Sequence, residues 1–135
     1  MTAITSRRLT ESTDSLLRFA MRADAVITGL AGIAGIPFAR WIAELSGTPV
    51  WFEYGMAAFF VAYGVVVLGL ASLPSVKRAG MGVVIANLLY TVGSVVFVLT
   101  DVFPLTTTGV VLTLAAGVYT LVFAELQYQG WRRIK

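Results

Sequence analysis

The chain has 135 residues, of which 58% are hydrophobic and 13% are charged, and its formal net charge is +3. Soluble domains carry about 25% charged residues, so this composition excludes an ordinary globular protein. Cysteine and histidine are absent, which excludes disulfides, iron–sulfur clusters, bis-histidine haem and the usual zinc sites. A chain of this length forms one domain without a separate soluble module.

Residues 1–13 show no apolar periodicity, and we expect them to be a flexible N-terminus. Asp14 can cap a short helix over residues 14–22, in which Leu16 and Phe19 lie close to Arg18. This mixture of apolar and basic residues predicts an interfacial helix that leads into the membrane.

Four stretches then lack any acidic or basic residue, and each can be extended to about 20 predominantly apolar residues, the length of a helix that crosses a bilayer. The stretches are Ala25–Ala39, Tyr54–Val76, Ala79–Thr100 and Val102–Ala124. They predict an all-α membrane protein, a four-transmembrane-helix bundle within residues 23–128. The expected spans are about 24–42, 51–72, 80–100 and 106–128, and residues 129–135 form a basic tail.

The basic residues predict the orientation of the chain. Nine of the ten lysines and arginines precede the first span, separate the second from the third, or follow the fourth, and Arg40 alone falls on the other side. The positive-inside rule therefore predicts a multi-pass protein of the plasma membrane, a bacterial inner membrane, with both termini in the cytoplasm. Because topology explains the basic residues, we expect the lipid bilayer and no nucleic acid as a partner.

Small residues indicate where the spans pack. Gly32 and Gly35 share a face of the first span, Gly55, Ala58 and Ala62 share one of the second, and small residues from Gly109 to Ala124 form a stripe on the fourth. The third span carries a polar stripe of Asn87, Tyr90, Thr91 and Ser94. Such faces let helices approach closely, and they predict that the third and fourth spans pack together and that both pack against the first.

Three polar residues near the cytoplasmic ends of the spans form a candidate cluster, namely Asp24, Asn87 and Glu125. Acidic residues at membrane depth often mark proton or cation paths. In the alternative interpretation, Asp24 caps its helix and Glu125 reaches the interface or pairs with an arginine.

Three tyrosines, Tyr63, Tyr90 and Tyr119, fall near the middle of the second, third and fourth spans. They are candidates to line a cavity for a lipid-like, quinone-like or other organic ligand. Alternatively, they form hydrogen bonds that join the helices.

Three segments resemble small four-span integral membrane proteins that are frequent in actinobacteria. These segments are Leu17–Ala25, Ala86–Tyr90 and Phe123–Gln127. The resemblance covers about residues 16–133, implies a four-helix membrane fold, and suggests that Asp24, Asn87 and Glu125 belong to the pattern. The chain is also similar in length to small multidrug exporters, but it lacks their mid-membrane glutamate in the first span.

The sequence contains no glycine-rich phosphate loop, nucleophile elbow or metal-ligand spacing, so we expect no catalytic residues, no metal, no cofactor and no enzyme activity. The leading hypothesis is a non-enzymatic accessory or interaction subunit of a membrane complex, associated with other membrane subunits or with itself. The alternative is a small homo-oligomeric transporter or a bundle that binds a lipid-like or quinone-like ligand.

Overall fold

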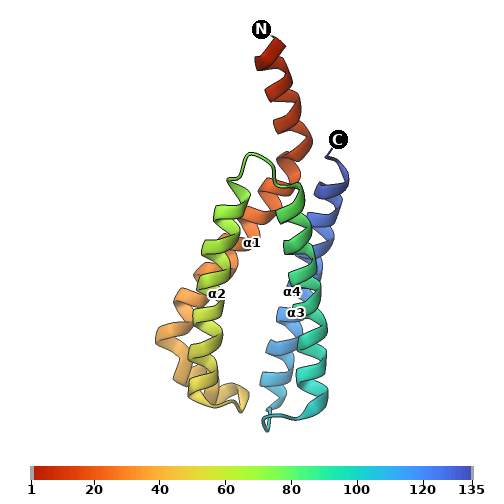
Figure 1. The fold of residues 1–135 in the computed structure, drawn as a ribbon. Coiled ribbons are helices and arrows are strands. Elements are labelled where there is room, and N and C mark those ends of the chain that lie inside the picture. The colour runs from red at the N-terminus through yellow and green to blue at the C-terminus, as the bar shows by residue number, and fades with distance from the viewer. Residues whose placement is uncertain (1, 135) are drawn as a thin grey trace.

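The computed structural model describes the backbone of residues 2–134 and the side chains of residues 13–134. Four helices make up this part of the chain: α1 (Thr2–Ser46), α2 (Val50–Ala71), α3 (Lys77–Thr100) and α4 (Thr107–Arg132) (Figure 1). Each is long and apolar enough to cross a membrane, which confirms the predicted all-helical class. Large apolar side chains cover the outer faces, as with Leu99, which is 75% exposed. Such a surface suits lipid rather than water.

The helices form two antiparallel hairpins whose termini lie at one end of the molecule, here called the terminal end (Figure 1). The opposite end, here called the far end, holds the α1–α2 and α3–α4 connections. Helix α1 packs along α2 and α4, and α3 packs along α4, whereas α2 and α3 make few contacts with each other. The expected packing of α4 against both α3 and α1 is confirmed, whereas α3 meets α1 at few positions because α4 is its main neighbour.

The N-terminal region differs from the expectation. Helix α1 runs without interruption from Thr2, so residues 2–13 are helical and residues 14–22 are part of α1 instead of a separate interfacial helix. Asp14 does not cap a helix but bonds Arg18 one turn later, with Oδ2 3.0 Å from the guanidinium. The physical reason is that no glycine or proline breaks the chain before Gly29.

Glycines bring α1 and α2 into backbone contact. A Cβ atom at Gly32 would lie 2.6 Å from the Ala57 carbonyl oxygen, and one at Gly64 would lie 2.7 Å from the Ala25 carbonyl oxygen. Ala57 and Gly64 of α2 therefore meet α1, while the predicted stripe of Gly55, Ala58 and Ala62 is exposed. Small residues occur on both faces of α2, so their spacing alone did not identify the packed one.

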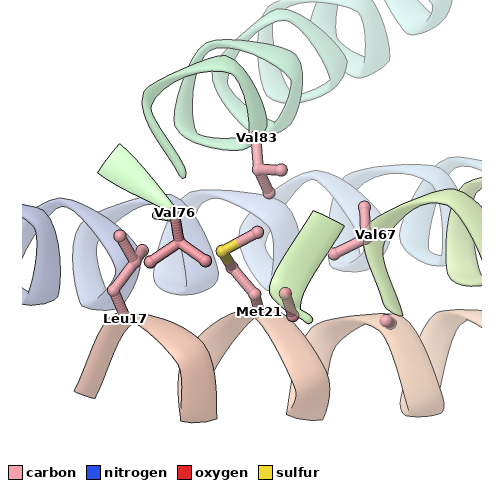
Figure 2. Close-up of a cluster of buried hydrophobic side chains, with 7 residues drawn as sticks. Leu17, Met21, Val67, Val76 and Val83 are labelled. Atoms are coloured by element: carbon pink, nitrogen blue, oxygen red, sulfur yellow. The ribbon is translucent and has the colours of Figure 1, made fainter. Parts of the chain in front are cut away.

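The hairpins are joined at the terminal end by a cluster of buried apolar side chains. Leu17 and Met21 of α1 meet Val67 of α2, Val76 of the α2–α3 connection and Val83 of α3 (Figure 2).

Arg18 also binds this end of α2. Its guanidinium donates hydrogen bonds to the carbonyl oxygens of Ala71, Leu73 and Pro74 at 2.9, 2.7 and 2.9 Å. These carbonyls lie at or beyond the last turn of α2, where helical partners are missing and a cation is favoured. Arg18 thus fixes the α2 terminus to α1.

Aromatic rings join the hairpins again at the far end. The ring of Phe52 in α2 stacks on Phe97 of α3, with ring centroids 5.4 Å apart, and meets Phe103 edge-on at 5.1 Å. Thr106 connects the same end of α4 to α1, since its amide donates to the Ser46 carbonyl and its hydroxyl to that of Leu45. Helices α2 and α3 are therefore held together at both ends, and the space between these contacts contains the candidate site.

Candidate functional site

The centre of the site is Asp24, an acidic residue of α1 that is 0% exposed. Its carboxylate accepts five side-chain hydrogen bonds, and every helix contributes at least one donor. Oδ2 accepts from Tyr63 Oη (2.6 Å), Asn87 Nδ2 (3.0 Å) and Gln127 Nε2 (3.0 Å), and Oδ1 accepts from Tyr119 Oη (2.9 Å) and Thr28 Oγ1 (3.1 Å). We call these six residues the Asp24 network.

The network stabilises a buried negative charge by neutral donors alone. Hydrogen bonds to an ionised group are shorter and stronger than those between neutral groups, and the five donors fill the acceptor positions of both oxygens. Within residues 13–134, where side chains are described, no lysine or arginine forms an ion pair with Asp24. The carboxylate is therefore satisfied by hydrogen bonds but its charge has no cationic partner, an unusual state for a buried acid.

Two amides of the network are themselves joined. Asn87 Nδ2 donates to Gln127 Oε1 at 2.9 Å in addition to its bond with Asp24. Asn87 and Gln127 are 2% and 0% exposed, and they come from α3 and α4. The pair fixes the orientation of both amide groups, because each nitrogen then faces an acceptor.

The network forms one wall of a cavity of about 230 Å³, here called the small cavity. Thr28, Tyr63, Asn87 and Tyr119 line it, and Asp24 lies behind them. The other lining residues are mainly apolar or aromatic: Ile27, Ala31, Phe59, Phe60, Ala86, Tyr90, Ala116 and Thr120.

A second cavity of about 490 Å³, here called the large cavity, lies toward the far end. Four residues line both cavities, namely Ala31, Phe60, Tyr90 and Ala116. The rings of Phe60 and Tyr90 face each other across the α2–α3 gap with centroids 6.1 Å apart. Glu53 lines the large cavity and accepts a hydrogen bond from Thr48 at 2.7 Å. The two cavities thus share a narrow aromatic boundary.

The structure brings together two of the three residues expected in the polar cluster. Asp24 and Asn87 are bonded, whereas Glu125 is exposed and accepts a hydrogen bond from Gln129 at 2.8 Å. Glu125 and Gln127 are two positions apart on α4, so they point to different faces of the helix, and Gln127 is the one that faces inward. The alternative in which Asp24 caps its helix is wrong, since the residue lies in the interior of α1.

The three tyrosines all line the small cavity, and two of them also act as interhelical donors. Tyr63 and Tyr119 bond Asp24, while Tyr90 separates the two cavities together with Phe60. Tyr63 and Tyr119 therefore fit both interpretations, because they line the cavity and also link helices by hydrogen bonds.

Gln127 and Thr28 were not among the predicted site residues. Thr28 lies one helical turn after Asp24, so its share in the same face was a usable signal. Gln127 is an uncharged amide near the end of an apolar span, and Glu125, two positions earlier, carries the stronger signal because it is charged.

Comparison with protein-family models, with curated proteins and with solved structures finds no match for this chain. The functional proposal therefore depends on the geometry of the site. It offers a buried anion, hydroxyl and amide groups in front of it, and an aromatic cavity large enough for a small molecule.

Proposed function

We propose that this chain is a non-enzymatic membrane protein that binds a small, largely apolar molecule in the small cavity. The observation that supports the proposal is the convergence of all four helices on Asp24 beside an aromatic cavity. Ligand sites are typically apolar pockets with a few well-placed polar groups, and this arrangement has both features. A purely structural network would not need an adjoining space.

The setting of the carboxylate adds a second reason. Ionisable groups inside a membrane are costly and usually serve ligands, ions or protons. Asp24 is bonded to Tyr63 and Tyr119, and these two phenols form part of the cavity wall. A molecule in the cavity would contact the network directly, so its binding is coupled to the contacts that join the helices.

The proposal is tested by saturable binding of a small aromatic probe to the purified protein in lipid nanodiscs. We choose 4-fluorobenzyl alcohol, followed by fluorine NMR, because its ring suits the aromatic wall and its hydroxyl can reach the network. Empty nanodiscs give the partition of the probe into lipid. The expected result is a saturable component that the empty discs lack.

A pair of matched variants locates the binding. Ala86 lines the small cavity and is exposed, so Ala86→Phe narrows the cavity without disturbing the core. Ala62 is equally exposed but lines neither cavity, so Ala62→Phe is the control. Binding should be lost in the first variant and kept in the second. Absence of saturable binding to the folded wild type, or equal binding by both variants, would refute the proposal.

A second candidate function is an interaction subunit that packs against another membrane protein or against a second copy of itself. The observation that favours it is the outward stripe of Gly55, Ala58 and Ala62 on α2, since a Cβ atom added at Gly55 would meet nothing within 4 Å. Small residues on a lipid-facing surface allow another helix to approach closely. The mass of the native particle in mild detergent tests this role, and a monomer would exclude it.

We also propose the plasma membrane as the location and the cytoplasm as the side of the terminal end. The distribution of lysine and arginine supports this orientation, because eight of the nine such residues within residues 2–134 belong to the terminal end.

A further inference from the structure

The Asp24 network gives the small cavity a negative character. The charge of Asp24 is buried, and no lysine or arginine of residues 13–134 is paired with it. A buried charge of this kind is normally balanced by a partner of opposite sign. In this protein a cavity lies beside the charge. The groups that separate the cavity from Asp24 are the same side chains that donate hydrogen bonds to its carboxylate.

The network groups that line the cavity use their hydrogens within the network. Tyr63 and Tyr119 direct their hydroxyl hydrogens to the carboxylate, at 2.6 and 2.9 Å. Both amide hydrogens of Asn87 are also used, one by Asp24 at 3.0 Å and the other by Gln127 at 2.9 Å. The remaining capacity of these groups is that of acceptors, namely the lone pairs of two phenol oxygens and of the Asn87 carbonyl. Such a wall favours a ligand that donates hydrogen bonds or carries positive charge.

The rest of the wall suits a cation with an apolar body. Phe59, Phe60 and Tyr90 line the cavity beside the two phenols of the network. The faces of aromatic rings attract cations, and the attraction grows when water is excluded. Aromatic rings and a nearby uncompensated carboxylate are the two features by which proteins recognise organic ammonium groups.

From these observations we infer that the small cavity selects an organic cation, a protonated amine or quaternary ammonium on an apolar body, and that Asp24 provides the charge that attracts it. This inference depends on the proposed binding function and names the class of ligand. Asp24 acts through the phenols and Asn87 and does not touch the ligand.

A competition experiment separates charge from shape. Benzyltrimethylammonium and neopentylbenzene have nearly the same shape and differ by a nitrogen cation in place of a carbon atom. Each is titrated against bound 4-fluorobenzyl alcohol in nanodiscs, after correction for partition into empty discs. We expect the cation to bind about tenfold tighter than the neutral compound in the wild type.

Three variants test the origin of this preference. Asp24→Asn removes the charge, so the cation should bind about tenfold more weakly while the neutral compound is unaffected. Glu125→Gln removes the same charge from an exposed position, and the preference should persist. Tyr63→Phe keeps the charge of Asp24 but removes from the cavity wall a phenol oxygen whose partial negative charge attracts the ammonium group, so it should weaken binding of the cation alone. This last variant keeps the inference testable if Asp24→Asn fails to fold.

The outcomes distinguish the inference from the function on which it depends. Equal affinities of the two compounds in the wild type would overturn the inference and leave the binding function intact. An unchanged preference in folded Asp24→Asn would also overturn it. Loss of saturable binding for 4-fluorobenzyl alcohol itself would instead refute the proposed function.

Discussion

Replacing Asp24 measures how strongly the network holds the helices together. Four of its donors come from helices other than α1, namely Tyr63, Asn87, Tyr119 and Gln127. Interhelical hydrogen bonds in membranes contribute about 0.6 kcal/mol each on average, so four contribute about 2.4 kcal/mol to helix association. Asp24→Leu removes all of them, and we expect it to lower the free energy of unfolding by about 2 to 3 kcal/mol.

Asp24→Asn should cost only about 1 kcal/mol. Asparagine keeps one acceptor oxygen, and the amides of Asn87 and Gln127 can rotate so that an oxygen faces the new NH₂ group. The difference in unfolding free energy between Asp24→Asn and Asp24→Leu therefore measures the contribution of the acceptor oxygen and not that of the negative charge.

The assay is reversible unfolding in mixtures of a mild detergent and SDS, followed by tryptophan fluorescence. Glu125→Leu is the control, because Glu125 is exposed and should change stability by less than about 0.5 kcal/mol. If Asp24→Asn is as unstable as Asp24→Leu, the negative charge itself holds the helices, and the reasoning from hydrogen bonds is wrong. If Asp24→Leu has the same free energy of unfolding as the wild type, the network contributes nothing to helix association.

Three further predictions concern the frame around the site. Gly64→Ala should lower the free energy of unfolding by about 1 to 3 kcal/mol, because its Cβ would lie 2.7 Å from the Ala25 carbonyl oxygen, whereas Gly69→Ala, with nothing within 4 Å, should be neutral or stabilising in the same assay. Arg18→Met should destabilise the end of α2 by about 1 kcal/mol and speed amide hydrogen exchange there, while unchanged exchange would argue against capping by Arg18. A cysteine at Thr48 should be labelled from outside intact cells and one at Thr2 should not, and the opposite result would reverse the orientation.

Much of the fold could be predicted from the sequence because a membrane imposes strong rules. Uncharged stretches of the right length located the four helices, and the expected bounds of α2, α3 and α4 agree with the structure within four residues, since every backbone group in lipid must bond within its own helix. Helix α1 is the exception, because it begins at Thr2, far before the expected span. The neighbours of each helix were harder to predict. Helix α2 has small residues on two faces, and the close approaches of Gly64 to Ala25 and of Ala57 to Gly32 distinguish the packed face from the lipid-facing one.

The candidate site could also be predicted only in part. Asp24 and Asn87 were recognisable because polar residues inside apolar spans are rare. Their partners depended on the rotation of α4, which places Gln127 inside and Glu125 outside. The rotation of α4 about its axis is set by its packing against neighbouring helices, so the residue types alone could not predict it.

The position of the network predicts a link between the proposed ligand binding and the association of the helices. Helices α2 and α3 touch little along their length apart from the end clusters and the Phe60–Tyr90 pair. Tyr63 of α2 and Asn87 of α3 both bond Oδ2 of Asp24, so this one oxygen joins the two helices between their ends. A ligand that draws on the lone pairs of Tyr63 or Asn87 changes the strength of that junction. Under the proposed binding function, we therefore expect occupancy of the cavity to be coupled to the separation of α2 and α3, because the same atoms serve both.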